Sequence, residues 1–236
     1  MTVASVMTTM PVAGFSDPFS SMTHLFSAPV FLLAGILLLR KFAGSRIRMI
    51  TLGIFVFGVV FLLTMSGVFH LLTPNTDERY VLRVLDHAAI FVLIAATFTP
   101  IHVLQFKGFM RWGILLLVWG AAITGLTLKS IYFEEVPNGI SLSLYLGLGW
   151  LGALTGYMLY RRDGLKAITP LLYGAAAYTL GACLEFINAP VFISGVIGPH
   201  EIFHVLVIAG IIFHWQFVYR AAQLHQQTVS NFYSFR

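Results

Sequence analysis

The chain has 236 residues, of which 58% are hydrophobic and 10% are charged, whereas charged residues make up about a quarter of a typical soluble domain. This composition excludes a soluble domain and indicates an integral membrane protein. The net charge is +5, but the basic residues lie mostly in short connections between apolar runs, so we expect no nucleic-acid partner. The single cysteine, Cys183, excludes an internal disulfide and a cysteine-rich metal site.

Seven apolar segments of about 20 residues are each long enough to cross a hydrocarbon core of roughly 30 Å. Each must be helical, because backbone hydrogen bonds in lipid have to be made within the segment. We therefore predict an all-α polytopic membrane protein with an N-terminal segment at 1–21, a seven-helix transmembrane domain at 22–220 and a C-terminal tail at 221–236. The segments lie near residues 22–42, 48–72, 81–105, 111–128, 140–160, 167–187 and 200–220.

The distribution of Lys and Arg predicts the orientation in the membrane. The connections after the first, third and fifth helices, with the C-terminal tail, hold eleven of these residues, and the other side holds three. We therefore expect the N-terminus outside and the C-terminus in the cytoplasm. Residues 1–20 contain no Lys or Arg, so they lack the charged start of a cleavable signal peptide, and we expect the N-terminus to be retained.

Two histidines four residues apart, His200 and His204, open the last segment. On a helix they lie about 40° apart around the axis and one turn apart along it, so both rings can reach one ion. His214 falls on a similar face but about 15 Å further along, which excludes it from a shared ligand sphere. The alternative is that each histidine only joins packed helices by hydrogen bonds. Two histidines fill half of a tetrahedral sphere, so a metal site requires another ligand.

His70, at the end of the second segment, lies at the required depth, and Ser66 precedes it by one turn on the same face. Three histidines leave a fourth position for water, as in a catalytic zinc site. Asp86, near the start of the third segment, is expected either to complete the sphere or to act as a general base on that water. Its alternative role is a carboxylate that faces the positive end of its own helix dipole.

The remaining histidines are not expected to be ligands, and one further acid has no assigned role. His87 points about 100° away from Asp86, which favours a supporting role or a contact between helices. Glu185 lies at the same depth as the trio, where it either serves the site, pairs with a neighbouring helix or lies at the membrane interface. His24, His102 and His225 have no partner by spacing and are interpreted as non-ligands.

Three ordered motifs resemble the hemolysin III family. This family is similar to the progestin and adipoQ receptors, which include the adiponectin receptors, and more distantly to alkaline ceramidases. The resemblance covers the chain from the first helix onward, and three motifs in matching helices are a specific signal. The motifs are Ser66-x3-His70, Leu85-Asp86-His87 leading to Thr99-Pro100, and His200-x3-His204.

The resemblance implies an intramembrane zinc ion bound by His70, His200 and His204, with Asp86 as the nearby carboxylate and Ser66 as the adjacent hydroxyl. It also implies lipid hydrolysis, with ceramide amide cleavage ascribed to some relatives, and a cytolytic label for bacterial members. The chain departs from the family in two ways. Asp17 to His24 matches the N-terminal acidic and Ser/His pattern of bacterial members only loosely, and the predicted orientation is opposite to that of adiponectin receptors.

The chain has no long N-terminal extension and no eighth membrane helix, which favours a bacterial-type protein in the inner membrane. Three functions then compete. The first is a zinc-dependent hydrolase of a membrane lipid amide or ester, and the second is a lipid-sensing receptor or scaffold with a structural zinc. The third is a hemolysin-type cytolytic protein, which would need a continuous polar channel, but no polar stripe repeats across several helices. The lipid and the oligomeric state are left open by the sequence.

Overall fold

The computed structural model describes Pro11 and residues 14–234. Within these residues the chain forms eight helices and no strand. They make seven spans that are long and apolar enough to cross a membrane, since α5 and α6 share the span Gly139–Asp163. This confirms the predicted all-α fold with seven membrane helices. The helices are α1 (Pro18–Lys41), α2 (Arg46–Leu71), α3 (Asp77–Gln105), α4 (Gly108–Ile131), α5 (Asn138–Trp150), α6 (Gly152–Asp163), α7 (Leu165–Ile187) and α8 (Pro199–Ser234).

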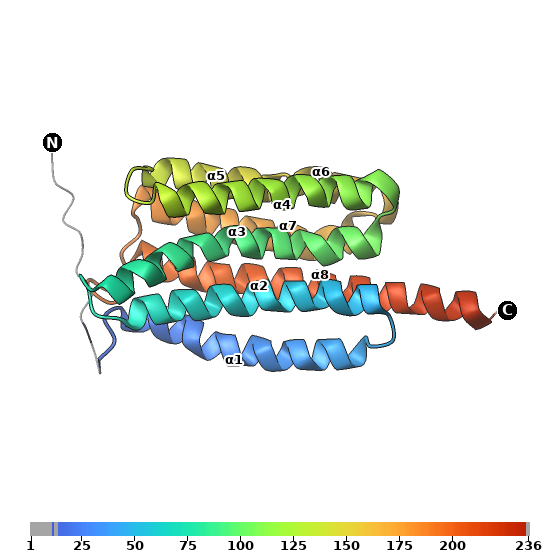
Figure 1. Cartoon of the computed structure of the whole chain (residues 1–236), viewed down its shortest axis with the longest axis horizontal. Helices are drawn as coiled ribbons and strands as arrows, with labels where there is room; N and C mark the ends of the chain where they lie inside the picture. The colour runs from blue at the N-terminus through green and yellow to red at the C-terminus, as the bar shows by residue number, and fades with distance from the viewer. Residues whose placement is uncertain (1–10, 12–13, 235–236) are drawn as a thin grey trace.

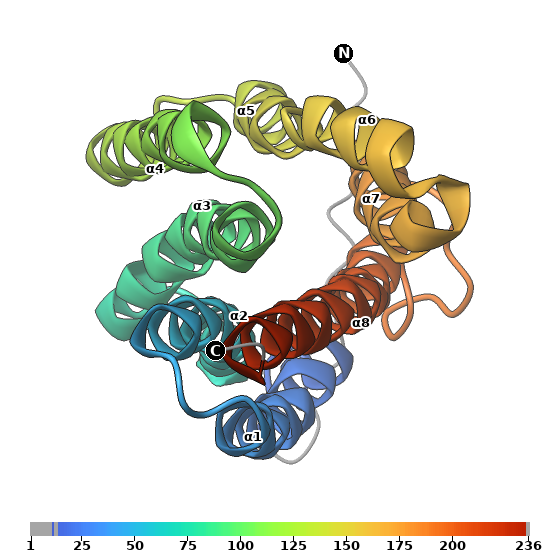
Figure 2. The same ribbon diagram turned by 90° about the vertical axis from the view of Figure 1, so that its right-hand side faces the viewer.

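The helices run side by side along the long axis of the molecule (Figure 1). α2 packs between α1 and α3, and α8 packs against α7 while also contacting α1 and α3. Seen along the helix axes, α3, α4, the α5–α6 pair, α7 and α8 follow one another around a ring (Figure 2). α1 lies outside this ring. Because α2 and α8 run in opposite directions, the end of α2 and the start of α8 lie at the same end of the bundle (Figure 1).

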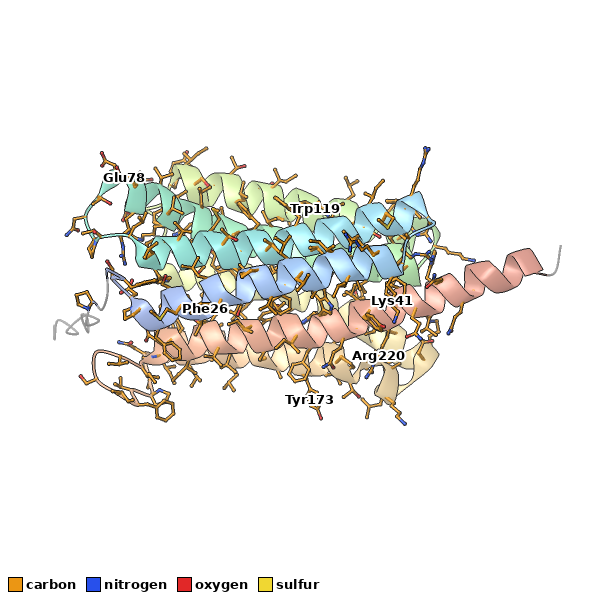
Figure 3. All side chains as sticks on the ribbon, turned by 90° about the horizontal axis from the view of Figure 1, so that it is seen from below. Phe26, Lys41, Glu78, Trp119, Tyr173 and Arg220 are labelled. Carbon is orange, nitrogen blue, oxygen red and sulfur yellow. The ribbon has the colours of Figure 1, made fainter. Side chains whose placement is uncertain are left out.

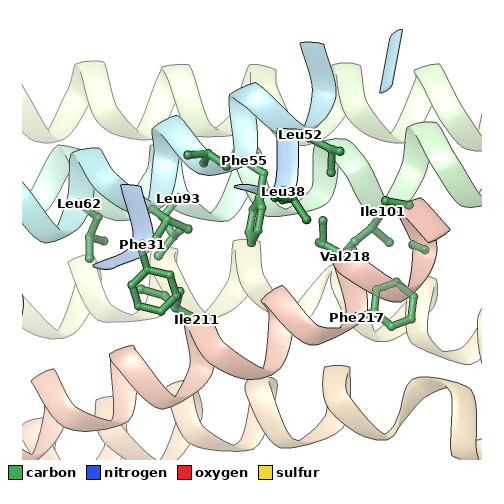
Figure 4. Close-up of a cluster of buried hydrophobic side chains, with 14 of the residues drawn as sticks. Phe31, Leu38, Leu52, Phe55, Leu62, Leu93, Ile101, Ile211, Phe217 and Val218 are labelled. Carbon is green, nitrogen blue, oxygen red and sulfur yellow. The ribbon is translucent and has the colours of Figure 1, made fainter. Parts of the chain in front are cut away.

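The main core lies between α1, α2, α3 and α8, and its buried side chains include Phe31, Phe55 and Ile211 (Figure 4). In lipid such helices associate through close van der Waals packing rather than through expulsion from water. Small residues permit that packing. A Cβ atom at Gly58 of α2 would lie 2.5 Å from the Cβ atom of Ala96 on α3, so these two helices can approach this closely only with glycine at that position.

Large apolar side chains such as Phe26 and Leu116 are exposed on the sides of the bundle, where a membrane protein meets lipid. Side chains project along the whole outer surface in Figure 3. The same view places Glu78 near one end and Lys41 and Arg220 toward the other (Figure 3). The two ends therefore differ in charge, as expected from the sequence.

Two arginines on the predicted cytoplasmic side bind the ends of helices there. Arg48 donates to the carbonyl of Phe42, which ends α1, at 2.7 Å, and Arg111 donates to that of Phe106, which ends α3, at 2.8 Å. Cations are favoured at such positions, because the last carbonyls carry the negative end of the helix dipole. Some of the basic residues that create the unequal distribution of Lys and Arg thus also stabilise the bundle.

Several helices begin or end a few residues away from the predicted limits, such as α1 at Pro18 rather than residue 22, and two differences are larger. The fifth predicted helix, residues 140–160, is interrupted at Leu151 and becomes α5 and α6. Gly149 and Gly152 flank this position, and glycine weakens a helix because it gains the most backbone freedom on unfolding. α8 continues to Ser234, so the predicted C-terminal tail is helical that far. Most of the predicted N-terminal segment, 1–21, lies outside the described residues.

Candidate metal centre

Three histidines from two helices converge at one end of the bundle. His70 lies in the last turn of α2, and His200 and His204 lie in the first turns of α8. Pro199 occupies the first position of α8, which suits a residue without an amide hydrogen. One nitrogen from each of the three rings lies within 4.8 Å of the other two. The structure therefore brings together all three histidines that the sequence predicted, in a group that could hold a metal ion.

The distances from His200 to the other two rings are close to those in a tetrahedral metal site. The Nε2 atom of His200 lies 3.1 Å from that of His70 and 3.1 Å from that of His204. With zinc–nitrogen bonds of about 2.0–2.1 Å, two ligands of a tetrahedral zinc ion lie about 3.3 Å apart. His70 and His204 are almost fully buried, which keeps competing water away from their rings.

Two of the three rings contact a carboxylate through Nδ1, the nitrogen that does not face the other histidines. Asp17 Oδ2 lies 2.9 Å from Nδ1 of His70, and Glu185 Oε1 lies 3.1 Å from Nδ1 of His200. An ionised carboxylate only accepts hydrogen bonds, so this pattern assigns a proton to each Nδ1, and a ring in its neutral form then carries its lone pair on Nε2. When both rings are neutral, the Nε2 lone pairs of His70 and His200 face each other at 3.1 Å, and a metal ion or a proton between them removes the repulsion. The donor set therefore fits a metal ion.

Further polar groups surround the trio from the starts of α1 and α8. The ring of His24 stacks on that of His204 with 4.0 Å between centroids. Glu201 is buried and accepts hydrogen bonds from the hydroxyl of Ser20, at 3.0 Å, and from the amide of Gly198, at 2.9 Å. These contacts close the site on the side of α1. His24 is not one of the grouped ligands, but its contact with His204 was not foreseen from its spacing.

Asp86 lies close enough to the trio to interact with it through its charge. When ionised, this carboxylate would favour a positive charge on the rings of His24, His70 and His200. It is not one of the three residues whose ligand atoms group together in the described chain, which favours a role beside the ion over direct ligation. Its nearest basic contact is Nδ1 of His87 at 3.8 Å. Ser66 is buried on α2, one turn before His70.

Three other histidines make local hydrogen bonds. His87, His102 and His214 each place Nδ1 within 2.7 to 2.9 Å of a backbone carbonyl oxygen. Nε2 of His102 also lies 3.0 Å from the hydroxyl of Thr155 on α6. His87 and His214 thus bond carbonyls one turn earlier in their own helices, whereas His102 joins α3 to α4 and α6. His87 additionally contacts the ring of Phe133, with 5.0 Å between centroids.

A depression of about 350 Å³ lies at the other end of α2, around the connection between α1 and α2. It is lined by Gly44, Ser45, Arg46, Met49 and Ile50. Since the trio lies at the end of α2 and this depression at its start, the depression takes no part in the candidate site.

The fold and this site define a class of protein: an integral membrane protein of seven helical spans with a cluster of three histidines near one end. The family model described as Haemolysin-III related matches residues 15–215. The chain belongs to this family, which confirms the resemblance seen in its sequence motifs.

Bacterial and animal relatives are similar over much of the chain. The hemolysin-3 homolog of Bacillus subtilis (strain 168) is 29% identical over 167 residues, which cover 71% of this chain and 75% of that protein. Hemolysin-3 of Bacillus cereus is 28% identical over 137 residues, 58% of each chain. The human monocyte to macrophage differentiation factor is 27% identical over 213 residues, which cover 84% of this chain and 83% of that protein.

Proposed function

We propose that this protein is a zinc-dependent hydrolase that cleaves an amide or ester bond of a membrane lipid. The observation that carries the proposal is the convergence of one nitrogen from each of three histidine rings. Carboxylates contact Nδ1 of two of these rings, so that Nε2 of each faces the centre of the group. The carboxylate of Asp86 lies nearby. Three imidazoles without a thiolate suit zinc among the available divalent ions. Three protein ligands also leave one position open, as in catalytic zinc sites.

In this proposal His70, His200 and His204 hold the ion, which when bound polarises a carbonyl group and makes water a nucleophile at neutral pH. Asp86 takes a proton from the attacking water and returns it to the leaving amine or alcohol as the carbonyl carbon–nitrogen or carbon–oxygen bond breaks. Ser66 supports the ring of His70 or binds the same water. The trio lies where α2 ends and α8 begins, at one end of the bundle (Figure 1), and in a membrane this end would lie near the polar part of the lipids.

A second candidate is a lipid-sensing receptor or scaffold in which the ion is structural. It is favoured by the origin of the three ligands, because an ion bound to His70 on α2 and to His200 and His204 on α8 would hold these two helices together. The hemolysin names of the Bacillus relatives favour cytolysis as a third candidate.

We further propose a bacterial inner membrane location with the N-terminus outside and the C-terminus in the cytoplasm. The Bacillus relatives support the bacterial assignment, and the eleven-to-three distribution of Lys and Arg supports the orientation. The candidate site then lies near the outer face. A C-terminal reporter that is active only outside the cytoplasm would contradict this orientation.

The hydrolase proposal is tested with purified protein whose metal content has been measured, incubated with a panel of membrane lipids that contain amide or ester bonds. Release of a fatty acid that stops on chelation and returns with added zinc supports the hydrolase. Full zinc content with specific lipid binding but no product from any lipid of the panel would favour the scaffold. Leakage of a dye from lipid vesicles without product would favour the cytolysin.

A further inference from the structure

Asp17 stands directly before α1 and contacts the end of α2 through both backbone and side chain. Its amide donates to the carbonyl of His70 at 3.0 Å, and the amide of Ser16 donates to that of Leu71 at 3.4 Å. Asp17 is also the N-cap residue of α1, where an aspartate commonly caps the first turn through its side chain. Here the carboxylate is directed instead to Nδ1 of His70, at 2.9 Å.

An arginine of α3 holds this carboxylate in place. Nη2 of Arg79 lies 2.6 Å from the same Oδ2 atom of Asp17, and another guanidinium nitrogen donates to the carbonyl of Leu72. The guanidinium also lies over the ring of Phe69, 4.8 Å from its centroid. With side-chain exposures of 15% for Asp17 and 16% for Arg79, the pair is mostly shielded from water. The carboxylate is thus fixed from two sides before any ligand binds.

Glu185 makes the same kind of contact with His200 in a more open setting. Both side chains of that pair are 39% exposed, and the distance is 3.1 Å. Water can replace an exposed carboxylate as a hydrogen-bond acceptor at little cost, whereas a buried ring left without an acceptor loses its hydrogen bond outright. The two carboxylates should therefore differ in their effect on the site.

We propose that Asp17, fixed by Arg79, is a positioning residue of the metal centre, which holds His70 with Nε2 directed toward the ion and so raises the affinity for zinc. The inference rests on the metal site of the proposed function but not on its hydrolase activity. It gives the segment before α1 a part in metal binding, although that segment supplies no ligand. Loss of such a supporting partner typically costs about 10- to 100-fold in metal affinity.

The test is the zinc dissociation constant of the purified full-length protein, measured by competition with a chelator of known affinity. Asp17→Ala should weaken zinc binding by about 10- to 100-fold. Asp17→Asn keeps an oxygen acceptor for His70 but loses the charge that pairs with Arg79, so its loss should be smaller. Glu185→Ala should also lose less than Asp17→Ala, because water can take the place of that carboxylate.

Glu134→Ala is the matched control, since it removes an exposed carboxylate that pairs with Arg83 at 3.3 Å and does not contact a histidine. Its zinc affinity should equal that of the wild type. A second readout is the visible absorption of the cobalt-substituted protein, which reports the geometry around the ion. This spectrum should change in Asp17→Ala and stay unchanged in Glu134→Ala.

Unchanged zinc affinity and an unchanged cobalt spectrum in Asp17→Ala would overturn the inference while leaving the metal site intact. If Asp17→Ala does not fold, Asp17→Asn decides by the same two readouts. Lower thermal stability of the metal-free Asp17 variants with wild-type zinc affinity would also overturn it, because Asp17 would then only join helices. Failure of the wild type to bind zinc would instead remove the metal site itself.

Discussion

Two histidines, His70 at one end of the bundle and His102 near the other, are almost equally buried, with 4% and 2% of their surface exposed. Nδ1 of His102 bonds a backbone carbonyl and Nε2 bonds the hydroxyl of Thr155, so the protein satisfies both nitrogens. Nδ1 of His70 bonds Asp17, but its Nε2 faces that of His200. Burial alone therefore does not mark a metal site in this membrane protein. The two sites differ in the partner of Nε2, which is a hydroxyl group for His102 and another histidine ring for His70.

The two ends also differ in the charges that serve them. Near the trio, the carboxylates of Asp17 and Glu185 bond histidine rings, and Asp86 lies within electrostatic range of His70 and His200. At the other end, Arg48 and Arg111 donate to carbonyls where helices end. Carboxylates behind histidine rings raise the electron density that the rings offer to a cation, whereas arginines at carbonyls only complete backbone hydrogen bonding. We therefore expect metal binding and lipid hydrolysis only at the end that carries the histidine trio.

Removing one histidine at each end should give the largest contrast. His204→Ala removes one of the three proposed ligands, so the bound metal should fall below about a tenth of an equivalent. His102→Ala removes a ring of the same size and burial and should keep the metal of the wild type. Elemental analysis of both purified variants measures the difference. Equal metal content in His204→Ala and His102→Ala would contradict a metal site at only one end of the bundle.

Changing one carboxylate near the trio should affect the reaction rather than the metal. Asp86→Asn should keep the ion and the fold but lose about 10²-fold or more of lipid hydrolysis, the usual contribution of a general base. Asp163→Asn, at the other end and paired with Arg162, is the control and should hydrolyse lipid at the wild-type rate. A wild-type rate in Asp86→Asn would exclude the general-base role. Loss of metal in that variant would make Asp86 a direct ligand.

The smallest effect is expected from the hydroxyl that faces His102. Thr155→Val keeps the shape of the side chain but leaves Nε2 of a buried ring without its partner. The cost is about 1–3 kcal/mol of stability, with no change in metal content. Thermal unfolding in detergent measures the stability, and elemental analysis measures the metal. A loss of metal in Thr155→Val would show that the two ends are coupled.

The seven spans and the histidine trio could be predicted from the sequence because both follow from local rules. Backbone groups in lipid must bond within a helix, so hydropathy locates the spans. His200 and His204 share a face by their four-residue spacing, and the alternating direction of the helices places His70 at the same depth. These steps require no knowledge of side-chain packing.

Among the partners of the trio, the sequence placed Glu185 at the right depth without assigning its role, and the other contacts could not be predicted in the same way. The stretch from Asp17 to His24 matches the family pattern only loosely, and the contact of Asp17 with His70 depends on how the chain passes over the end of α2. His24 has no spacing signal, because its partner His204 lies on another helix. The interruption at Leu151 was missed because hydropathy runs unbroken through the span Gly139–Asp163.

The central claim is that His70, His200 and His204 together bind one zinc ion. The most direct test is the zinc content of the purified wild type beside that of the triple variant His70→Ala, His200→Ala and His204→Ala, both produced with zinc in the medium and purified without chelator. We expect one zinc ion per wild-type chain and less than about a tenth of an equivalent in the triple variant. A wild type with less than about a tenth of an equivalent, or a triple variant that keeps the full amount, would contradict the account.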